Sequence, residues 1–148
     1  MQGAQILLVE DDDVLCDLVR RNLLARGHEV KLAADAESAL MSLRSGHFDL
    51  VFLDINLPDK TGWDVLRTAQ QEGILCPQDL NGHKQVLPVV VLSAVKVSPR
   101  RLAEFHPLAY LPKPFPMEAL LRLAAEVAIW QQMTAAPESQ LTVNTGDP

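Results

Sequence analysis

Four short apolar runs, each ending at residues that carry chemistry, constrain the fold of this chain most strongly. They occupy residues 5–9, 48–53, 87–92 and 109–112. The runs are continuous rather than alternating, which is typical of parallel strands buried on both faces. Glu10 and Asp11 follow the first run, and Asp54, Ser93 and Lys113 follow the others in order. Because open parallel sheets carry their sites at the carboxyl ends of the strands, we expect a phosphate-and-metal constellation at one edge.

Segments with the 3.6-residue spacing of amphipathic helices separate these runs. We expect helices over residues 14–24, 36–44, 63–69, 99–105 and 117–133, and a further strand over residues 29–34. Strict alternation of strands and helices implies right-handed crossovers and a parallel sheet. The predicted fold class is therefore α/β: a doubly wound five-stranded parallel sheet of flavodoxin-like order 2-1-3-4-5, with helices on both faces. In this order the acids after the first and third strands become neighbours.

The length and composition indicate one domain. A chain of 148 residues with 48% hydrophobic content can bury a single core. We expect this domain to cover residues 1–133. Residues 74–86 show no periodicity and contain Asn81-Gly82, so they are interpreted as an irregular insertion. The polar residues 134–148 are expected to form a disordered tail.

Charge and cysteine content argue against several classes of function. The net charge is −6 and no basic stripe is present, so we expect no direct binding to nucleic acid. Cys16 and Cys76 form no C-x-x-C spacing, which favours a reducing cytoplasm. No apolar run approaches the ~20 residues of a membrane span, and no targeting segment opens the chain. We therefore expect a soluble cytoplasmic protein without a membrane contact.

Five motifs, each at the end of the expected element, resemble the receiver domains of two-component response regulators, the CheY-like superfamily. They are LVEDD at residues 8–12, LDINLP at 53–58, TG at 61–62, LSA at 92–94 and YLPKPF at 110–115. The resemblance covers about residues 5–133. It implies that Asp54 takes a phosphoryl group from a phosphohistidine of a sensor histidine kinase or histidine phosphotransfer protein, with Mg²⁺ or Mn²⁺ as cofactor. Such a module catalyses only its own phosphorylation and slow dephosphorylation.

The resemblance also implies a metal site. Asp11, Asp54 and the main-chain carbonyl of Asn56 would ligate the cation, with Glu10 acting through a water. Hard oxygen donors of this kind suit Mg²⁺. Carboxylates this close repel one another, so without a cation at least one pKa would rise.

The remaining implied residues grip the phosphoryl group and transmit the signal. Lys113 and Ser93 would contact phosphoryl oxygens, and Pro114 resembles the family's cis-proline. Movement of Ser93 would let the aromatic Tyr110 swing from exposed to buried. The signal would leave through the helix at 99–105, the strand at 109–112 and the last helix, toward an unknown output partner. A homodimer through this face is possible but not implied by the residues.

Three departures from the family pattern and two rival functions stay open. The insertion, with residues 76–85 at its centre, is longer than usual, and Pro99 and Pro107 alter the fourth helix and its surface. Val95, two residues after Ser93, cannot orient an attacking water, so we expect a long-lived phosphoryl state.

One rival is an unphosphorylated pseudo-receiver that serves as a docking module. The other is a haloacid-dehalogenase-like phosphatase, which would need an aspartate where Asn56 stands.

Overall fold

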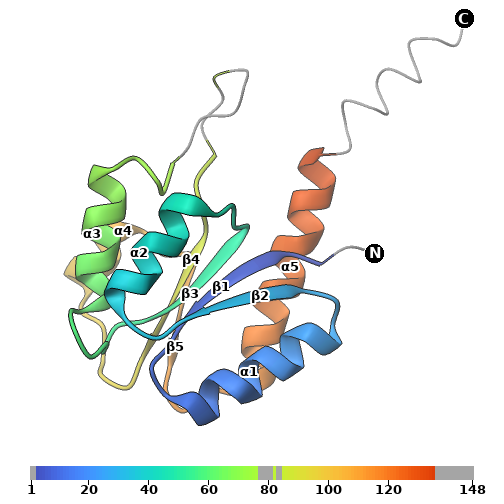
Figure 1. The fold of residues 1–148 in the computed structure, drawn as a ribbon, viewed down its shortest axis with the longest axis horizontal. Helices are drawn as coiled ribbons and strands as arrows, with labels where there is room; N and C mark the ends of the chain where they lie inside the picture. The colour runs from blue at the N-terminus through green and yellow to red at the C-terminus, as the bar shows by residue number, and fades with distance from the viewer. Residues whose placement is uncertain (1–2, 77–81, 83–84, 136–148) are drawn as a thin grey trace, which may run out of the picture.

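The chain folds into one five-stranded parallel sheet with the order β2-β1-β3-β4-β5 (Figure 1). The computed structural model describes residues 3–76, 82 and 85–135. The strands are β1 Gln5–Val9, β2 Glu29–Ala33, β3 Leu50–Asp54, β4 Val89–Ser93 and β5 Ala109–Pro112. This arrangement confirms the predicted fold class and strand order.

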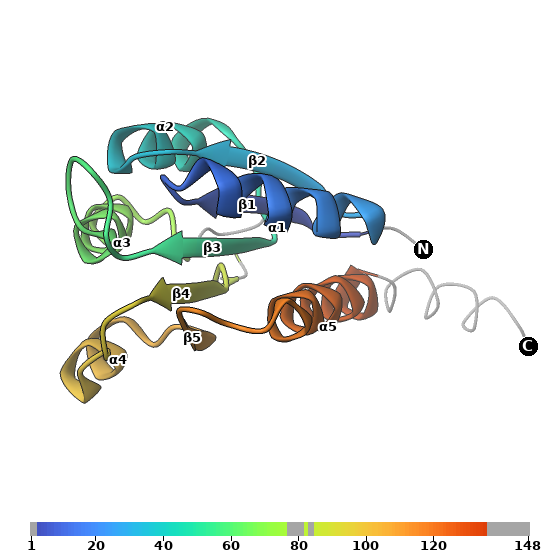
Figure 2. The same cartoon turned by 90° about the horizontal axis from the view of Figure 1, so that it is seen from below.

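Helices cover both faces of the sheet. They are α1 Asp13–Ala25, α2 Ala36–Ser45, α3 Gly62–Gln71, α4 Pro99–Phe105 and α5 Met117–Ala135. Figure 2 shows α2, α3 and α4 on one side of the sheet and α1 and α5 on the other. Helix α5 continues two residues beyond the expected domain end at residue 133. The rest of the expected tail, residues 136–148, lies outside the described residues.

The apolar runs supply two core layers because successive side chains of a strand point to opposite faces. In β3, Val51 and Leu53 pack against α2 and α3, whereas Leu50 and Phe52 pack against α1 and α5. Every residue of β3 and β4 is buried. Burial on both faces explains why these segments are continuous in hydrophobicity rather than alternating.

Polar caps begin the helices at the edge where the strands end. The N-cap residues of α1, α2, α3 and α4 are Asp12, Asp35, Thr61 and Ser98, and each side chain accepts hydrogen bonds from backbone N–H groups of its helix. These bonds satisfy donors that have no partner within the helix. The Asp12 side chain thus points toward α1 and caps the start of that helix.

Helix α4 is attached to α3 by stacked rings. The ring centroids of Trp63 and Phe105 lie 5.6 Å apart with an interplanar angle of 18°. Arg101 lies over the Trp63 ring and Arg67 over the Phe105 ring, at 5.7 and 5.8 Å from the ring centroids. Helix α4 buries no residue completely, and its Leu102 and Phe105 are partly buried against the core layer of α2 and α3. Pro99 lies in the first turn of α4, where a proline is tolerated, so the expected short helix forms.

The connection between α3 and β4, which contains the predicted insertion, joins the sheet at the edge where β4 begins (Figure 1). The backbone N–H of Leu87 donates to the carbonyl of Leu75 over 2.8 Å and closes its base. Residues 77–81 and 83–84, the centre of the predicted insertion, lie outside the described residues. Among the helices described, none has the length and apolar content needed to cross a membrane.

A buried histidine joins the turn before β2 to the start of β1. His28 Nδ1 accepts a hydrogen bond from the backbone N–H of Ala4 over 3.0 Å. Burial lowers the pKa of His28 below its usual 6.5, and the positive charge of Arg26 lowers it further. The neutral imidazole is the form that fits the fold, since a protonated Nδ1 cannot accept this bond.

Stability should therefore depend on pH through His28. As the pH falls through about 6.5, the unfolded chain binds a proton that the folded chain disfavours, so stability is lost on acidification. The hydrogen bond from Ala4 to His28, worth about 1 kcal/mol, is part of this loss, because a protonated Nδ1 cannot accept it. In His28→Asn the amide oxygen can accept the same bond without titrating. Urea unfolding at about pH 8 and about pH 5.5 should show a smaller acid loss in the variant than in the wild type. Equal losses would contradict the assignment.

Candidate functional site

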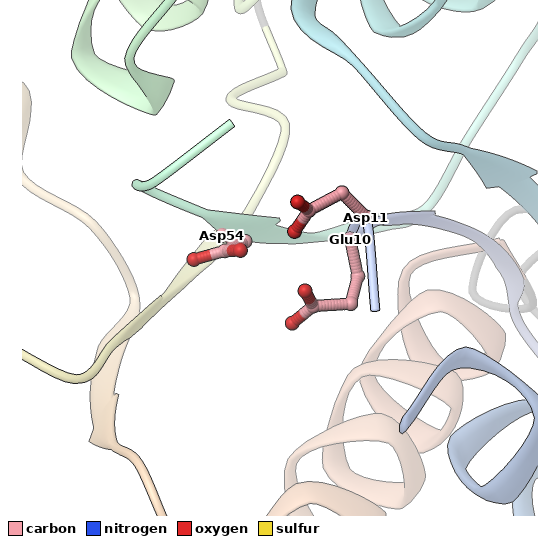
Figure 3. Close-up of side chains that lie close together, drawn as sticks. All are labelled: Glu10, Asp11 and Asp54. Atoms are coloured by element: carbon pink, nitrogen blue, oxygen red, sulfur yellow. The ribbon is translucent and has the colours of Figure 1, made fainter. Parts of the chain in front are cut away.

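Three carboxylates converge where β1 and β3 end. Glu10 and Asp11 follow β1, and Asp54 is the last residue of β3. The two strands are paired in parallel, so their carboxyl ends lie side by side. One carboxylate oxygen from each residue lies within 4.8 Å of the others. Figure 3 shows the three carboxylates projecting from these strand ends into a common space.

The cluster is buried on one side and open on the other. Glu10 is 1% exposed and Asp54 is 3% exposed, whereas Asp11 lies on the surface. Because Asp11 is exposed and the other two carboxylates are buried, an ion can reach the cluster from solvent on the side of Asp11. An ion or a phosphoryl group arriving there would meet two carboxylates that are already shielded from water.

Lys113 supplies the positive charge of the site. Its Nζ donates a hydrogen bond to Glu10 and lies 3.4 Å from Asp54 Oδ2. The residue is placed by β5, and its backbone N–H donates to the carbonyl of Ser93 over 2.8 Å. The following Lys113–Pro114 peptide bond is cis, in agreement with the expectation for Pro114. One ammonium group therefore serves both buried carboxylates.

The pKa values reflect this crowding. Burial raises the pKa of Glu10 to about 7, with a further rise from the negative charge of Asp54, although the hydrogen bond from Lys113 opposes the change. Burial lowers the pKa of Lys113, but the hydrogen bond and charge of Glu10, together with Asp54, outweigh burial, so its pKa is raised. The site thus holds more negative charge than its single ammonium group balances.

The loop from β3 to α3 continues the site. The Asn56 N–H donates to Asp54 Oδ1 over 3.1 Å, which orients that carboxylate. The Gly62 N–H donates to the carbonyl of Ile55 over 2.7 Å. A Cβ on Gly62 would lie 2.7 Å from the backbone oxygen of Asp54, so only glycine fits at this approach of α3 to the strand end.

Ser93 and Tyr110 meet at a shared acceptor in the loop after β4. The Ser93 hydroxyl donates to the carbonyl of Val95 over 2.7 Å and accepts from the Val95 N–H over 3.1 Å. The Tyr110 hydroxyl donates to the same carbonyl over 3.3 Å. Tyr110 is half-buried and packs against the core layer of α2 and α3. The two residues expected to act as a switch are therefore linked through one backbone group.

The donor set of the cluster fits a hard divalent cation. Its three carboxylates provide oxygen ligands within reach of one another. Mg²⁺ prefers oxygen ligands and keeps several waters, which the open side of the cluster permits. A cation would also offset the unbalanced negative charge around Glu10.

Sequence reasoning missed one residue at this edge. Asp59 lies in the loop after β3, and its carboxylate accepts hydrogen bonds from Ala36 and Glu37 at the start of α2. The Pro58-Asp59 pair is a turn signal in the sequence. Nothing in the local pattern connects that turn with a helix more than twenty residues earlier.

A family model described as the response regulator receiver domain matches residues 6–125. The chain belongs to this family, as its motifs predicted. Receiver domains bind Mg²⁺ at an acidic site, and the cluster of Glu10, Asp11 and Asp54 fits such a phosphoacceptor site.

Two regulators illustrate the relationship in sequence. The response regulator protein PmrA of Pseudomonas aeruginosa is 36% identical over 118 residues, which cover 78% of this chain and 48% of PmrA. The response regulator MprA of Mycobacterium tuberculosis is 35% identical over 121 residues, which cover 80% of this chain and 48% of MprA. The chain thus spans about half the length of these two regulators.

Solved structures share the fold. The chemotaxis response regulator CheY4 of Vibrio cholerae superimposes with a TM-score of 0.71 at 26% identity, covering 85% of this chain and 99% of that chain. A CheY-like receiver domain protein from Methanospirillum hungatei has a TM-score of 0.71 at 25% identity, covering 90% and 99%. The similarity therefore extends over the whole of each of these solved chains.

The crowded carboxylates should make the metal-free protein less stable at high pH. The pKa of Glu10 rises from 4.5 to about 7 on folding, so the folded chain binds the extra proton between these values. Stability due to this group is then lost as the pH rises through that window. The rise corresponds to at most about 3 kcal/mol. Glu10→Gln stays neutral, while Lys113 keeps Asp54 as a partner.

Urea unfolding in the presence of a chelator checks this effect. We expect Glu10→Gln to be more stable than the wild type at about pH 8, with the difference shrinking toward about pH 5. Glu29→Gln, a substitution of an exposed glutamate on β2, is the control and should change stability little. A Glu10→Gln protein that is no more stable than the wild type at the higher pH would refute the electrostatic account.

Proposed function

We propose that Asp54 accepts a phosphoryl group from a phosphohistidine on a sensor histidine kinase or a histidine phosphotransfer protein. The observation that carries this proposal is the convergence of Asp54 with Glu10, Asp11 and Lys113 at one edge of the sheet. Family membership supports it, because the chain matches the receiver domain model over residues 6–125. The module is a signalling phosphoacceptor and does not turn over a separate substrate.

The chemistry requires a carboxylate nucleophile in line with the bond that breaks. An oxygen of Asp54 forms a bond to phosphorus while the bond between phosphorus and the imidazole nitrogen of the donor breaks. That nitrogen keeps the electron pair, and the donor leaves as a neutral imidazole because its other ring nitrogen carries a proton. The hydrogen bond from the Asn56 N–H to Asp54 Oδ1 leaves Oδ2, on the side of Lys113, as the candidate nucleophile.

The metal ligands follow from the same cluster. Asp11, Asp54 and the main-chain carbonyl of Asn56 would hold Mg²⁺ or Mn²⁺, with Glu10 contributing through a water. When bound, the cation neutralises the oxygens of the phosphoryl group during transfer. The exposure of Asp11 beside the buried Glu10 and Asp54 supports entry of a hydrated ion from solvent.

Lys113 and Ser93 would change partners after transfer. Lys113 lies between Glu10 and Asp54, so a short rotation of its flexible side chain brings the ammonium group to a phosphoryl oxygen. The Ser93 hydroxyl would leave the carbonyl of Val95 to donate to another oxygen. Because Tyr110 donates to that same carbonyl, a shift of the loop would move the acceptor of the Tyr110 hydroxyl and so change the position of the ring. This is a two-state element biased by added charge.

The surface formed by α4, β5 and α5 would carry the signal to an output partner. The module would use this surface without direct contact to nucleic acid, and a homodimer through it remains an alternative. The chain spans about half of PmrA and of MprA, so these assignments concern the receiver domain. The output of the whole protein is a separate proposal.

Phosphorylation by a small donor tests the proposed function directly. Incubation with phosphoramidate or acetyl phosphate and Mg²⁺ should add one phosphoryl group to the intact protein, seen by mass spectrometry. Asp54→Asn should remove this gain, because an amide cannot act as the nucleophile. Asp13→Asn is the matched control, since Asp13 is an exposed acid in the first turn of α1, outside the cluster.

The other outcomes of this experiment separate the rival functions. A wild type that gains no mass at any Mg²⁺ concentration would refute the proposal and favour a pseudo-receiver that docks without phosphorylation. Sustained release of phosphate from small phosphomonoesters would indicate a phosphatase. A gain that persists in Asp54→Asn would place the phosphoryl group on another residue.

The phosphorylated state should be long-lived. Val95 is 69% exposed beside the site and is apolar, so it cannot orient a water for attack on the acyl phosphate. We expect Val95→Gln, which can hydrogen-bond the attacking water, to speed decay of the acyl phosphate. Lys96→Gln, at the next exposed position of the loop, is the control. Decay of the wild-type acyl phosphate within seconds in Mg²⁺ buffer would contradict this prediction.

A further inference from the structure

Asp59 joins two parts of the fold that are distant in sequence. Its Oδ1 accepts from the backbone N–H of Ala36 over 2.8 Å, and its Oδ2 accepts from that of Glu37 over 3.1 Å. Oδ1 also accepts from the N–H of Lys60 over 2.9 Å. These bonds lower the pKa of Asp59 and keep it ionised. The loop after β3 is thus attached to the start of α2 by both oxygens of one carboxylate.

Helix α2 obtains its first hydrogen bonds from two separate acids. The N–H groups of Ala36 and Glu37 donate to Asp59, and that of Ser38 donates to Asp35 Oδ1 over 2.7 Å. Asp35 is the local N-cap, a role that many helices fill with one residue. Asp59 therefore adds a contact between elements to a helix that already has its own cap.

The loop that carries Asp59 is closed at its base and at its tip. At its base the Gly62 N–H donates to the carbonyl of Ile55 over 2.7 Å. This bond flanks the isolated antiparallel bridge between Asn56 and Thr61. At its tip Asp59 binds α2. Asn56 thus lies between a fixed base and a fixed tip, and its backbone has little freedom to move.

We propose that Asp59 is a positioning residue, which holds the Asn56 carbonyl in place for the metal by tethering the loop to the N-terminus of α2. The inference rests on the proposed function, in which the Asn56 carbonyl ligates the cation. A backbone ligand on a loop must be held by the rest of the loop, since Mg²⁺ demands near-ideal geometry. Metal binding and the start of α2 are then coupled, and the coupling is reciprocal.

The tether can be removed without unfolding the loop. Leu57 is buried in the core layer of α2 and α3, so it keeps the loop on the protein when Asp59 is replaced. Asp59→Ala removes both contacts with α2, and Asp59→Asn retains one acceptor oxygen without the charge. Asp35→Ala is the matched control, because it removes a cap of the same helix that accepts from the Ser38 N–H and not from the loop.

The first measurement is the affinity for Mg²⁺ by isothermal titration calorimetry. We expect Asp59→Ala to weaken binding by about 10-fold, the lower end of the effect of partners that orient metal ligands. Asp59→Asn should lie between Asp59→Ala and the wild type, and Asp35→Ala should bind as the wild type does. If Asp59 were only a helix cap, Asp59→Ala and Asp35→Ala would have the same affinity for Mg²⁺. This result would overturn the tether.

The second measurement is amide hydrogen exchange at the start of α2. In the wild type, Mg²⁺ should slow exchange of the Ala36 and Glu37 amides, because binding stabilises the loop that holds them. In Asp59→Ala this response should vanish. A wild type that binds Mg²⁺ with no change at these amides would refute the tether alone. A wild type that neither binds Mg²⁺ nor gains a phosphoryl group would overturn the proposed function and the tether together.

Discussion

The burial of two carboxylates side by side is the constraint on which the site and its surroundings depend. A parallel sheet brings the ends of β1 and β3 together, and with them Glu10 and Asp54. Buried like charges are unfavourable, so the fold brings Lys113 from β5 to contact both. Burial, with a smaller contribution from the charge of Asp54, still raises the pKa of Glu10 to about 7 against the hydrogen bond from Lys113. A site in this condition favours the arrival of a cation, and this connects the stability of the protein with the chemistry proposed for it.

The loops around this charge cluster differ in how firmly they are held. The loop after β3 is closed by backbone bonds at its base and by Asp59 at its tip. In the loop after β4, the hydroxyls of Ser93 and Tyr110 both donate to the carbonyl of Val95. Hydroxyl groups exchange acceptors at small cost, because each bond contributes about 1 kcal/mol net. The first loop is therefore suited to hold a ligand, and the second to change when charge is added at Asp54.

Much of the fold and of the site could be predicted from the chain alone. The continuous apolar runs around Leu53 and Val91 indicated strands buried on both faces, and the helices between them implied a parallel sheet. Once the strand order was predicted, Asp54 and Glu10 had to meet. Asp59 could not be predicted, because its partners lie on a helix whose position depends on packing. The hydrogen bonds from Ser93 and Tyr110 to one shared acceptor could not be predicted for the same reason.

The sequence by itself determined which elements form, where they end and which polar residues follow each strand. These properties depend on periodicity, caps and turn residues that act within a few positions of the chain. Only the tertiary structure decided which oxygens face one another, that Lys113 contacts Glu10 as well as Asp54, and that Asp59 reaches Ala36. Contacts of this kind depend on the relative placement of whole elements, which packing across the sheet sets and local sequence does not encode.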